Sequence, residues 1–279
     1  MRLVQISDTH VSHRGGATNE NFQKIARFIN EQLKPDAVVH SGDIMILDPD
    51  NVADRSAAKD LLGLIDAPLF VIPGNHDVGE PGDNPFAGIN TTSDRVQAHV
   101  DAFGPDHWVE FVGDYAVVGL NSEVIGAGIP EEGTQWDWLD TVPDQIGDRP
   151  TLVFSHKPFW QPTIDEPAHT LNIPPVYLER LLEVFNKIPV KSFGSGHVHT
   201  YARSTHGDAL IIHAPSTAFT ARGAIDLPAL EQLGVVEYVC EDGSVEAYFR
   251  SIPHLVEGEP RNIPEFTAHL ADLGITLDA

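Results

Sequence analysis

Five short polar clusters each follow a segment with the composition of a buried strand. The clusters are Asp8 with His10, Gly42-Asp43, Gly74-Asn75-His76-Asp77, His156, and Gly196-His197-Val198-His199. In α/β sheets the carboxyl ends of the strands border the crevice in which ligands bind. We therefore expect Asp, Asn and His side chains from five separate segments to meet at one edge. Oxygen and imidazole ligands without a thiolate suit Mn, Fe or Zn and do not resemble a structural zinc site.

Glycine precedes a candidate ligand at three of these strand exits. Gly42, Gly74 and Gly196 stand where the chain must turn sharply. Only glycine adopts a positive φ, or allows a close backbone approach, at little cost. His197 and His199 would share a face on a strand but can diverge toward two metals on a loop.

Each cluster has an ordinary alternative when it is taken alone. Asp8 and His10 could form a turn or a helix cap, and the cluster from Asn75 to Asp77 could be a turn. His156 could be a core histidine bonded to backbone. These alternatives would have to hold at five strand ends in this order, which favours a metal site.

The early part of the chain alternates between strand and helix patterns. Strands are expected at 2–7, 36–40 and 68–72, with helices at 19–33 and 54–65 between them. This βαβαβ order predicts parallel strands. The segment 80–95 is rich in Gly, Pro, Asn and Asp and is expected to be a long loop of the kind that often has a function.

The later part of the chain contains more strands and fewer helices, which predicts an antiparallel portion. Strands are expected at 115–120, 151–155, 191–195, 209–213, 234–240 and 245–250. A helix is expected at 174–186. We predict an α/β fold of two packed sheets flanked by helices, in one domain over 1–252. Residues 253–279 are expected to form a C-terminal tail that packs on the surface, with a short helix near 264–273.

The composition of the chain limits the classes of molecule that it is expected to bind. The 279 residues carry a net charge of −24, which disfavours long nucleic acids and anionic membranes but permits a phosphorylated substrate where metals reverse the local field. No apolar run reaches the length of a membrane helix, and the first residues read as a strand, so we expect neither a membrane span nor a secretory signal. The single cysteine, Cys240, fits a reducing cytoplasm and a buried thiol. The acidity is also compatible with a saline habitat.

The order of the polar clusters resembles that of the calcineurin-like metallophosphoesterase superfamily, D-x-H, G-D, G-N-H-[ED], H and G-H-x-H, over about residues 1 to 220. Weaker likeness to the class III cyclic-nucleotide phosphodiesterase branch lies in Leu120-Asn121-Ser122, Gln135-Trp136-Asp137-Trp138-Leu139 and Ala214-Pro215-Ser216. The fold implied by this resemblance is a four-layer αββα sandwich with two mixed sheets. Members of this superfamily are often homodimers, which makes a homodimer an expectation here.

The resemblance also implies roles for single residues. Asp8, His10, Asp43 and His199 would hold a first metal, and Asp43, Asn75, His156 and His197 would hold a second. The cofactors would be two divalent or mixed-valence ions of Mn, Fe or Zn. Asp43 would bridge the ions. His76 would be the catalytic residue that faces the substrate phosphate, and Asn75 would lie beside it at the substrate.

One position departs from the family pattern. Many members have Asp or Tyr three residues after the bridging Asp, where this chain has Ile46. If that residue normally helps to orient the catalytic histidine, another group must do so here. Asp48, Asp50 and Asp77 are candidates, although Asp48 and Asp50 are more typical of a solvated turn.

The function expected is hydrolysis of a small phosphodiester by a hydroxide that bridges two metals. A cyclic nucleotide such as cAMP and a glycerophosphodiester are the substrate candidates. A phosphomonoesterase and a non-catalytic metal-binding scaffold of the same fold remain alternatives. The His-x-His-x-Asp-His pattern of acyl and lactam metallohydrolases is absent.

The sequence does not decide the roles of several aromatic residues and histidines. Phe159 is expected to pack the segment 157–175, whereas Trp160 and His169 could instead stack on a substrate base. His213 could support the site or simply end a strand. The histidines without motif context, to which no role is assigned, are His13, His40, His99, His107, His206, His254 and His269.

Overall fold

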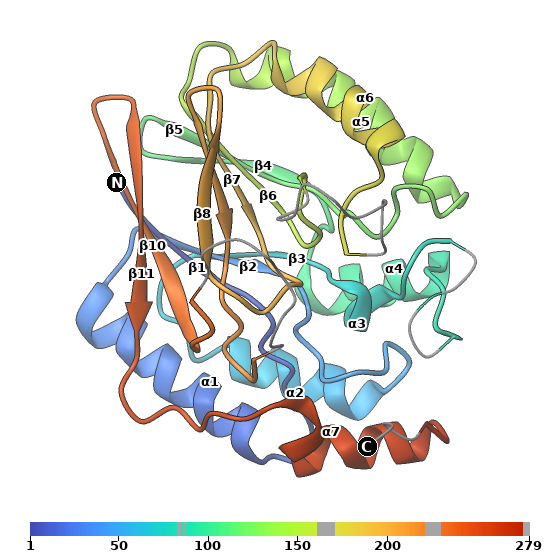
Figure 1. The fold of residues 1–279 in the computed structure, drawn as a ribbon. Helices are drawn as coiled ribbons and strands as arrows, with labels where there is room; N and C mark the ends of the chain where they lie inside the picture. The colour runs from blue at the N-terminus through green and yellow to red at the C-terminus, as the bar shows by residue number, and fades with distance from the viewer. Residues whose placement is uncertain (83–84, 86–87, 161–170, 221–229, 276–279) are drawn as a thin grey trace.

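Two mixed β-sheets pack face to face in the computed structural model, and helices cover both outer faces (Figure 1). The structure describes residues 1–82, 85, 88–160, 171–220 and 230–275. The layers confirm the predicted four-layer αββα sandwich and the mixed character of both sheets.

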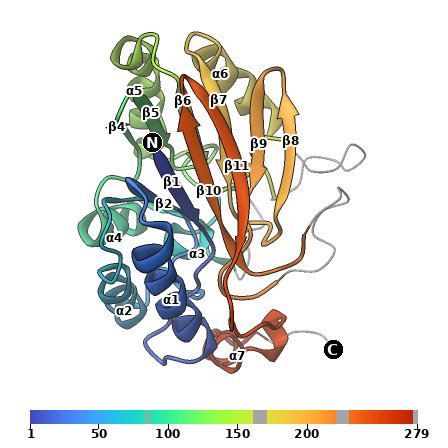
Figure 2. The same ribbon diagram turned by 90° about the vertical axis from the view of Figure 1, so that its left-hand side faces the viewer.

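The first sheet has the strand order β11-β10-β1-β2-β3 (Figure 2). Its strands are β1 (Arg2–Ile6), β2 (Ala37–Ser41), β3 (Leu69–Ile72), β10 (Gly234–Glu241) and β11 (Ser244–Ser251). The first three are parallel, as expected, and β10 joins β1 in antiparallel orientation. Helices α1 (Ala17–Phe28) and α2 (Val52–Leu62) make the crossovers between the parallel strands. The predicted helix 19–33 is observed in two parts. The first is α1, which ends at Phe28, and the second is a π-helical turn over Ile29–Leu33.

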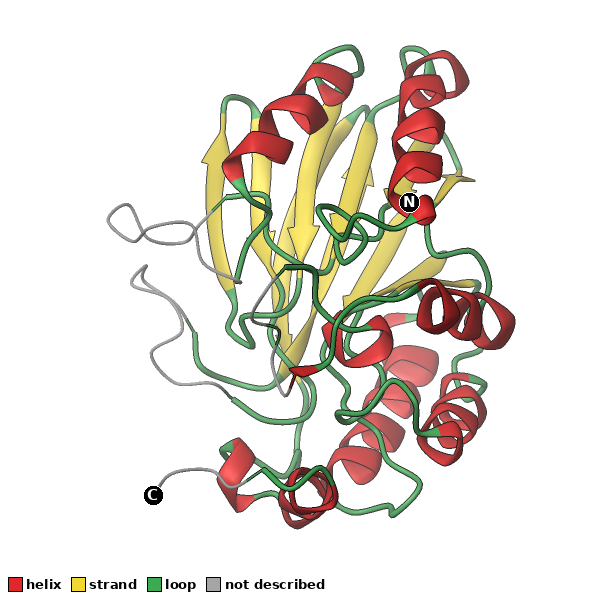
Figure 3. Ribbon diagram, turned by 90° about the vertical axis from the view of Figure 1, so that its right-hand side faces the viewer, coloured by secondary structure: helices red, strands yellow, loops and turns green. Residues whose placement is uncertain are grey.

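The second sheet has the strand order β4-β5-β6-β7-β9-β8. Its strands are β4 (Trp108–Val112), β5 (Tyr115–Gly119), β6 (Thr151–Ser155), β7 (Val190–Ser195), β8 (Ala202–His206) and β9 (Ala209–His213). Strands β5, β6, β7 and β9 are parallel, and β4 and β8 are antiparallel edge strands. Helices α5 (Pro130–Ile146) and α6 (Pro175–Phe185) cover the outer face of this sheet (Figure 3).

Three apolar layers hold the sandwich together. Phe22 and Ile25 of α1 pack against Val4 of β1 on one outer face. Phe154 of β6 and Tyr238 of β10 meet between the sheets with their ring centroids 5.6 Å apart. The third layer lies under α5 and α6. Because side chains of each sheet fill both of its faces, the strands read as continuous apolar runs.

The elements that were not predicted from the sequence include β4, β8, α5 and α4 (Ser93–Phe103). Helix α4 begins within the predicted loop 80–95, after Thr92, whose hydroxyl accepts a hydrogen bond from Arg95 N at 3.3 Å. Helix α5 contains Pro143 in its interior and has a weak apolar stripe, which obscured its period.

The C-terminal segment makes an apolar contact with the sandwich. Helix α7 (Pro264–Asp272) buries Phe266 and Leu270 against Ile46, Leu47 and Phe219. These partners lie in the loops that follow β2 and β9. Helix α7 therefore lies beside the loop that carries Asp43. Within the described residues, no helix combines the length and apolar character needed to span a membrane.

Candidate metal centre

The predicted polar clusters lie at the carboxyl ends of five parallel strands. Asp8 follows β1, Asp43 follows β2, and Asn75 begins the four-residue helix α3 (Asn75–Val78) after β3. His156 follows β6, and His197 and His199 follow β7. Strands of both sheets thus supply residues to one edge of the sandwich, as the sequence predicts.

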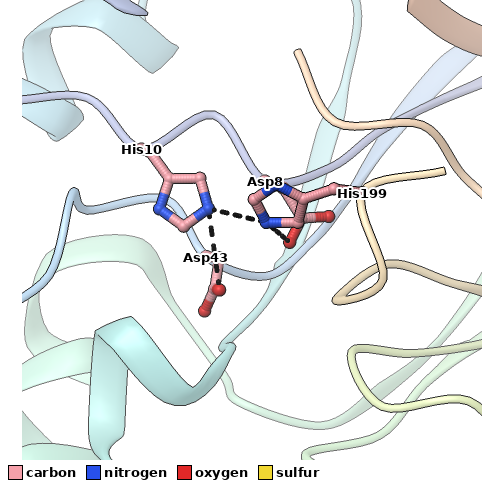
Figure 4. Close-up of side chains that lie close together, drawn as sticks. All are labelled: Asp8, His10, Asp43 and His199. Carbon is pink, nitrogen blue, oxygen red and sulfur yellow. Dashed lines mark hydrogen bonds and ion pairs between the residues drawn. The ribbon is translucent and has the colours of Figure 1, made fainter. Parts of the chain in front are cut away.

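The first group contains Asp8, His10, Asp43 and His199, all buried (Figure 4). The Nε2 atoms of His10 and His199 lie 3.1 Å apart. Nε2 of His199 is 3.3 Å from Asp8 Oδ1, and Nε2 of His10 is 3.8 Å from Asp43 Oδ2. Two imidazoles and two carboxylates therefore face a common point.

The second group forms around the other oxygen of the same carboxylate. Asp43 Oδ1 is 3.3 Å from Nε2 of His156. That nitrogen is also 3.1 Å from Asn75 Oδ1 and 3.1 Å from His197 Nδ1. Asp43 thus belongs to both groups, one through each oxygen.

Backbone carbonyls orient three of the imidazoles. His10 Nδ1 donates to Ile46 O at 3.3 Å, His156 Nδ1 to Ser41 O at 2.9 Å, and His199 Nδ1 to Phe219 O at 2.9 Å. Each donation leaves Nε2 as the ring nitrogen that is directed at the neighbouring carboxylates. Histidines that bind metals are commonly held in this way. The buried carboxylates need a positive charge beside them, and they converge with imidazole nitrogens, so the donor set fits two metal ions.

The ligand loops have strained backbones. Asp8, His10, Asp43, His197 and His199 all have positive φ, between 44° and 70°. Non-glycine residues seldom adopt this region, and such strain clusters at functional sites.

The glycines at the strand exits allow the loops to approach closely. Gly42 has φ 96°. A Cβ on Gly74 would lie 2.3 Å from Asp43 N, and one on Gly196 would lie 1.9 Å from Ser7 Oγ. Close approach and positive φ are the two reasons for which glycine was expected at these positions.

Burial and neighbouring charges set the protonation of the metal-free site. Burial is the largest influence on His156 and lowers its pKa, but the carboxylates of Asp43, Asp8 and Glu123 outweigh it and raise the pKa to about 10. Burial and the neighbouring His76 lower the pKa of His10 to about 3. Burial opposes ionisation of Asp43, yet the adjacent histidines hold its pKa well below the usual range. The metal-free site therefore keeps a proton on His156 that a metal would displace.

Asp77 connects the two loops that carry Asp43 and Asn75. Its carboxylate accepts hydrogen bonds from the backbone N–H groups of Ile44, Met45 and Gly74 at 2.8–3.1 Å. Burial and the charge of Asp43 raise its pKa to about 6. Asp77 thereby fixes the spacing of the loops that hold the second group.

The carbonyl of Ile46 orients His76. Its oxygen accepts a hydrogen bond from His76 Nδ1 at 2.7 Å, and the backbone N of His76 donates to Asp43 Oδ1 at 2.9 Å. The backbone of Ile46, at the position where the family pattern differs, therefore contributes to the orientation of His76. Asp48 accepts from Asp50 N at 2.9 Å within a turn, and the Asp50 carboxylate pairs with the guanidinium of Arg95.

Two phenylalanines beside the site were missed by the sequence analysis. Phe219 stacks on His10 with ring centroids 4.6 Å apart, and Phe266 of α7 lies 5.2 Å from Phe219 and 6.5 Å from His76. The spacing of Ile263, Phe266 and Leu270 does indicate an apolar helix face, but nothing in the sequence says where that face packs.

The structure shows the contacts of most of the aromatic residues and histidines whose roles the sequence left undecided. Phe159 packs in the core against Phe193, as expected. Trp160 stacks on His206 with centroids 4.5 Å apart and meets Phe193 at 5.1 Å, which favours packing over base stacking. His213 is buried at the end of β9 and lies 3.2 Å from Ser195 Oγ. His169 lies outside the described residues.

Comparison with known proteins agrees with this geometry. A family model described as calcineurin-like phosphoesterase matches residues 1–201. A probable glycerophosphodiester phosphodiesterase GpdQ of Arcobacter nitrofigilis is 26% identical over 262 residues, which cover 89% of this chain and 88% of that protein. Serine/threonine-protein phosphatase CPPED1 of Danio rerio is 29% identical over 186 residues, 63% of this chain and 57% of that protein. The structure of purple acid phosphatase PPD1 from yellow lupin superposes with a TM-score of 0.63 at 15% identity, over 93% of this chain and 52% of that one, which shows a shared fold.

Proposed function

The chain belongs to the calcineurin-like phosphoesterase family, and we propose that it hydrolyses a small phosphodiester with two metal ions. The shared carboxylate of Asp43 is the observation that carries this proposal. Its Oδ2 faces His10 at 3.8 Å and its Oδ1 faces His156 at 3.3 Å. One buried carboxylate directed at two ligand groups is the arrangement that a dinuclear centre requires.

The ligand sets follow from the two groups. The first metal is held by Asp8, His10, Asp43 and His199, and the second by Asp43, Asn75, His156 and His197. We propose Mn, Fe or Zn, because the donors are imidazoles and oxygens. Two such ions, when bound, lower the pKa of a water molecule and offset charge on the phosphoryl oxygens.

His76 is proposed as the residue that acts on the substrate. The donation of its Nδ1 to Ile46 O directs Nε2 toward the metal groups, and its ring lies 4.8 Å from that of His10. Asn75 precedes it and is a proposed ligand, so His76 would lie beside the second metal. From there, a protonated Nε2 can donate to the leaving oxygen of the ester. Asn75 is a neutral ligand, which leaves more positive charge available to the substrate beside it.

A diester is favoured over a monoester for two reasons. The chain carries a net charge of −24, which disfavours a dianionic monoester more than a monoanionic diester. The similarity to the phosphodiesterase GpdQ extends over 89% of the chain, whereas that to the phosphatase CPPED1 covers 63%. We propose a glycerophosphodiester as the first natural substrate to test, with cAMP as the second.

The test compares the rates at which Mn-loaded protein hydrolyses a phosphodiester and a phosphomonoester. Bis(p-nitrophenyl) phosphate should be cleaved faster than p-nitrophenyl phosphate, and metal analysis after desalting should give about two equivalents per chain. A preference for the monoester of about tenfold would assign the site to a phosphomonoesterase. Two bound metals without turnover of any phosphoester would support a non-catalytic scaffold.

The predicted homodimer and cytoplasmic location remain predictions. Size-exclusion chromatography with light scattering tests the first, and fractionation of the source cells tests the second.

A further inference from the structure

A second group of potential ligands lies outside the proposed dinuclear centre. It consists of His13 in the loop after β1, Asp54 in the first turn of α2, and His269 in α7. Asp54 and His269 are buried, and the side chain of His13 is 37% exposed. None of the three residues belongs to the motifs that identify the family.

The carboxylate of Asp54 stands between the two histidines. Its Oδ1 accepts from both the backbone N and the Nδ1 of His13 at 2.7 Å, and its Oδ2 is 2.8 Å from His269 Nε2. The backbone bond holds the carboxylate in place. Oδ2 and the two imidazole nitrogens then remain as donors that can share one ion.

His269 is oriented in the manner of a metal ligand. Its Nδ1 donates to the carbonyl of Glu265 at 2.7 Å, one turn earlier in α7. Histidines that bind metals commonly donate their second nitrogen to a backbone carbonyl, which fixes the ring and directs Nε2 to the ion. The same arrangement holds His10, His156 and His199 in the dinuclear centre.

We propose that His13, Asp54 and His269 form a mononuclear site for a divalent transition metal, with Zn²⁺ as the best match. Two imidazoles and one carboxylate are a frequent zinc donor set, and the exposed side of His13 gives water access to the fourth position. Donor atoms around tetrahedral zinc lie about 3.3–3.5 Å apart, so the present contacts must open by about half an ångström. Rotation of the exposed His13 side chain opens its contact with Asp54, whereas the 2.8 Å contact of His269 with Asp54 must open by a small movement of α7.

The metal would fasten α7 to the body of the protein. His269 is the α7 ligand, whereas His13 and Asp54 belong to the N-terminal half. On the same helix, Phe266 packs against Phe219 beside His76. A zinc ion at this position therefore stabilises the wall of the substrate site without taking part in the reaction.

The test measures zinc binding by the full-length chain after removal of metals with a chelator. Equilibrium dialysis against Zn²⁺ should show that His13→Ala and His269→Gln each bind about one equivalent less than the wild type. Because the readout is a difference between chains, it does not depend on how many ions the dinuclear centre holds, nor on whether the protein is a phosphodiesterase. The matched control is His107→Ala, since His107 also contacts an aspartate, Asp106, at 2.8 Å but belongs to none of the ligand groups among the described residues.

Thermal unfolding provides a second measurement. The increase in Tm on adding zinc should be greater for the wild type than for either variant, by roughly 5 °C at a zinc concentration about a hundredfold above Kd. The increase is compared for each chain with its own value in chelator, so a loss of basal stability does not affect the result. Zinc content and zinc-dependent stabilisation that are equal in the wild type and in either variant would overturn the proposal and leave an ionic contact alone.

Discussion

Asp77→Ala should disrupt the candidate metal centre although Asp77 is not a proposed ligand. Its buried carboxylate accepts hydrogen bonds from the backbone N–H groups of Ile44, Met45 and Gly74. Alanine leaves all three donors buried and unpaired, and each costs about 1–3 kcal/mol. The sum, about 3–9 kcal/mol, approaches the whole stability of an ordinary domain, about 5–15 kcal/mol.

Urea unfolding and metal analysis on the same preparations test this expectation. Asp77→Ala should lower the free energy of unfolding by at least about 3 kcal/mol and reduce binding of the second metal, because the loops of Asp43 and Asn75 lose their connection. The control is Asp48→Ala, whose carboxylate accepts one hydrogen bond, from Asp50 N, in a turn. A variant at position 77 with the stability and metal content of the control would refute the role given to this carboxylate.

Three further predictions concern the metals, the leaving group and pH. Asp43→Asn should lose metal from both groups and nearly all activity, and near-native metal content would show that Asp43 does not bridge. His76→Ala should keep both metals, lose little activity on p-nitrophenyl esters, and lose about 10²–10⁴-fold on alkyl esters, which need a proton on the leaving oxygen. Equal losses on both esters would exclude the acid role. Burial is the largest influence on the pKa of His269 and lowers it, but the hydrogen bond and charge of Asp54, together with the hydrogen bond to the Glu265 carbonyl, outweigh burial and raise the pKa. The contact between His269 and Asp54 therefore stabilises the fold fully at pH values below the pKa that His269 has in the unfolded chain. This stabilisation is lost as the pH rises through the higher pKa that His269 has in the folded protein. In chelator, urea unfolding should show a larger difference between wild type and His269→Gln at about pH 5.5 than at about pH 8.5, and a constant difference would contradict this assignment.

The sequence predicted the position of the site because its chemistry is local. A polar residue directly after an apolar strand can only lie at the strand's carboxyl end, and parallel strands bring such ends to one edge. Asp8, Asp43 and His156 could therefore be placed without knowledge of the packing. Close backbone approach at Gly74 and Gly196 was likewise predictable from residue type.

The remaining features depend on contacts between distant segments. The role of Ile46 comes from its carbonyl, which every residue type has, so no side-chain pattern could reveal it. Phe219 and Phe266 meet through the packing of α7, whose direction is not encoded in its own apolar spacing. Helix α5 was missed because Pro143 interrupts its pattern. The sequence thus predicted the convergence of the candidate ligands better than the groups that hold and cover them.

The cost of forming this centre explains why so many backbone contacts surround it. Five non-glycine residues with positive φ destabilise the fold by about 1 kcal/mol each, and the buried carboxylates of Asp8 and Asp43 add repulsion. Metal binding relieves the repulsion but not the backbone strain, so the loops must be held by other means. Asp77 holds one pair of loops, and Ser216 Oγ donates to Asp8 O at 2.9 Å to hold a third. The strain is therefore offset by hydrogen bonds between the protein's own groups, which do not need a metal ion to form.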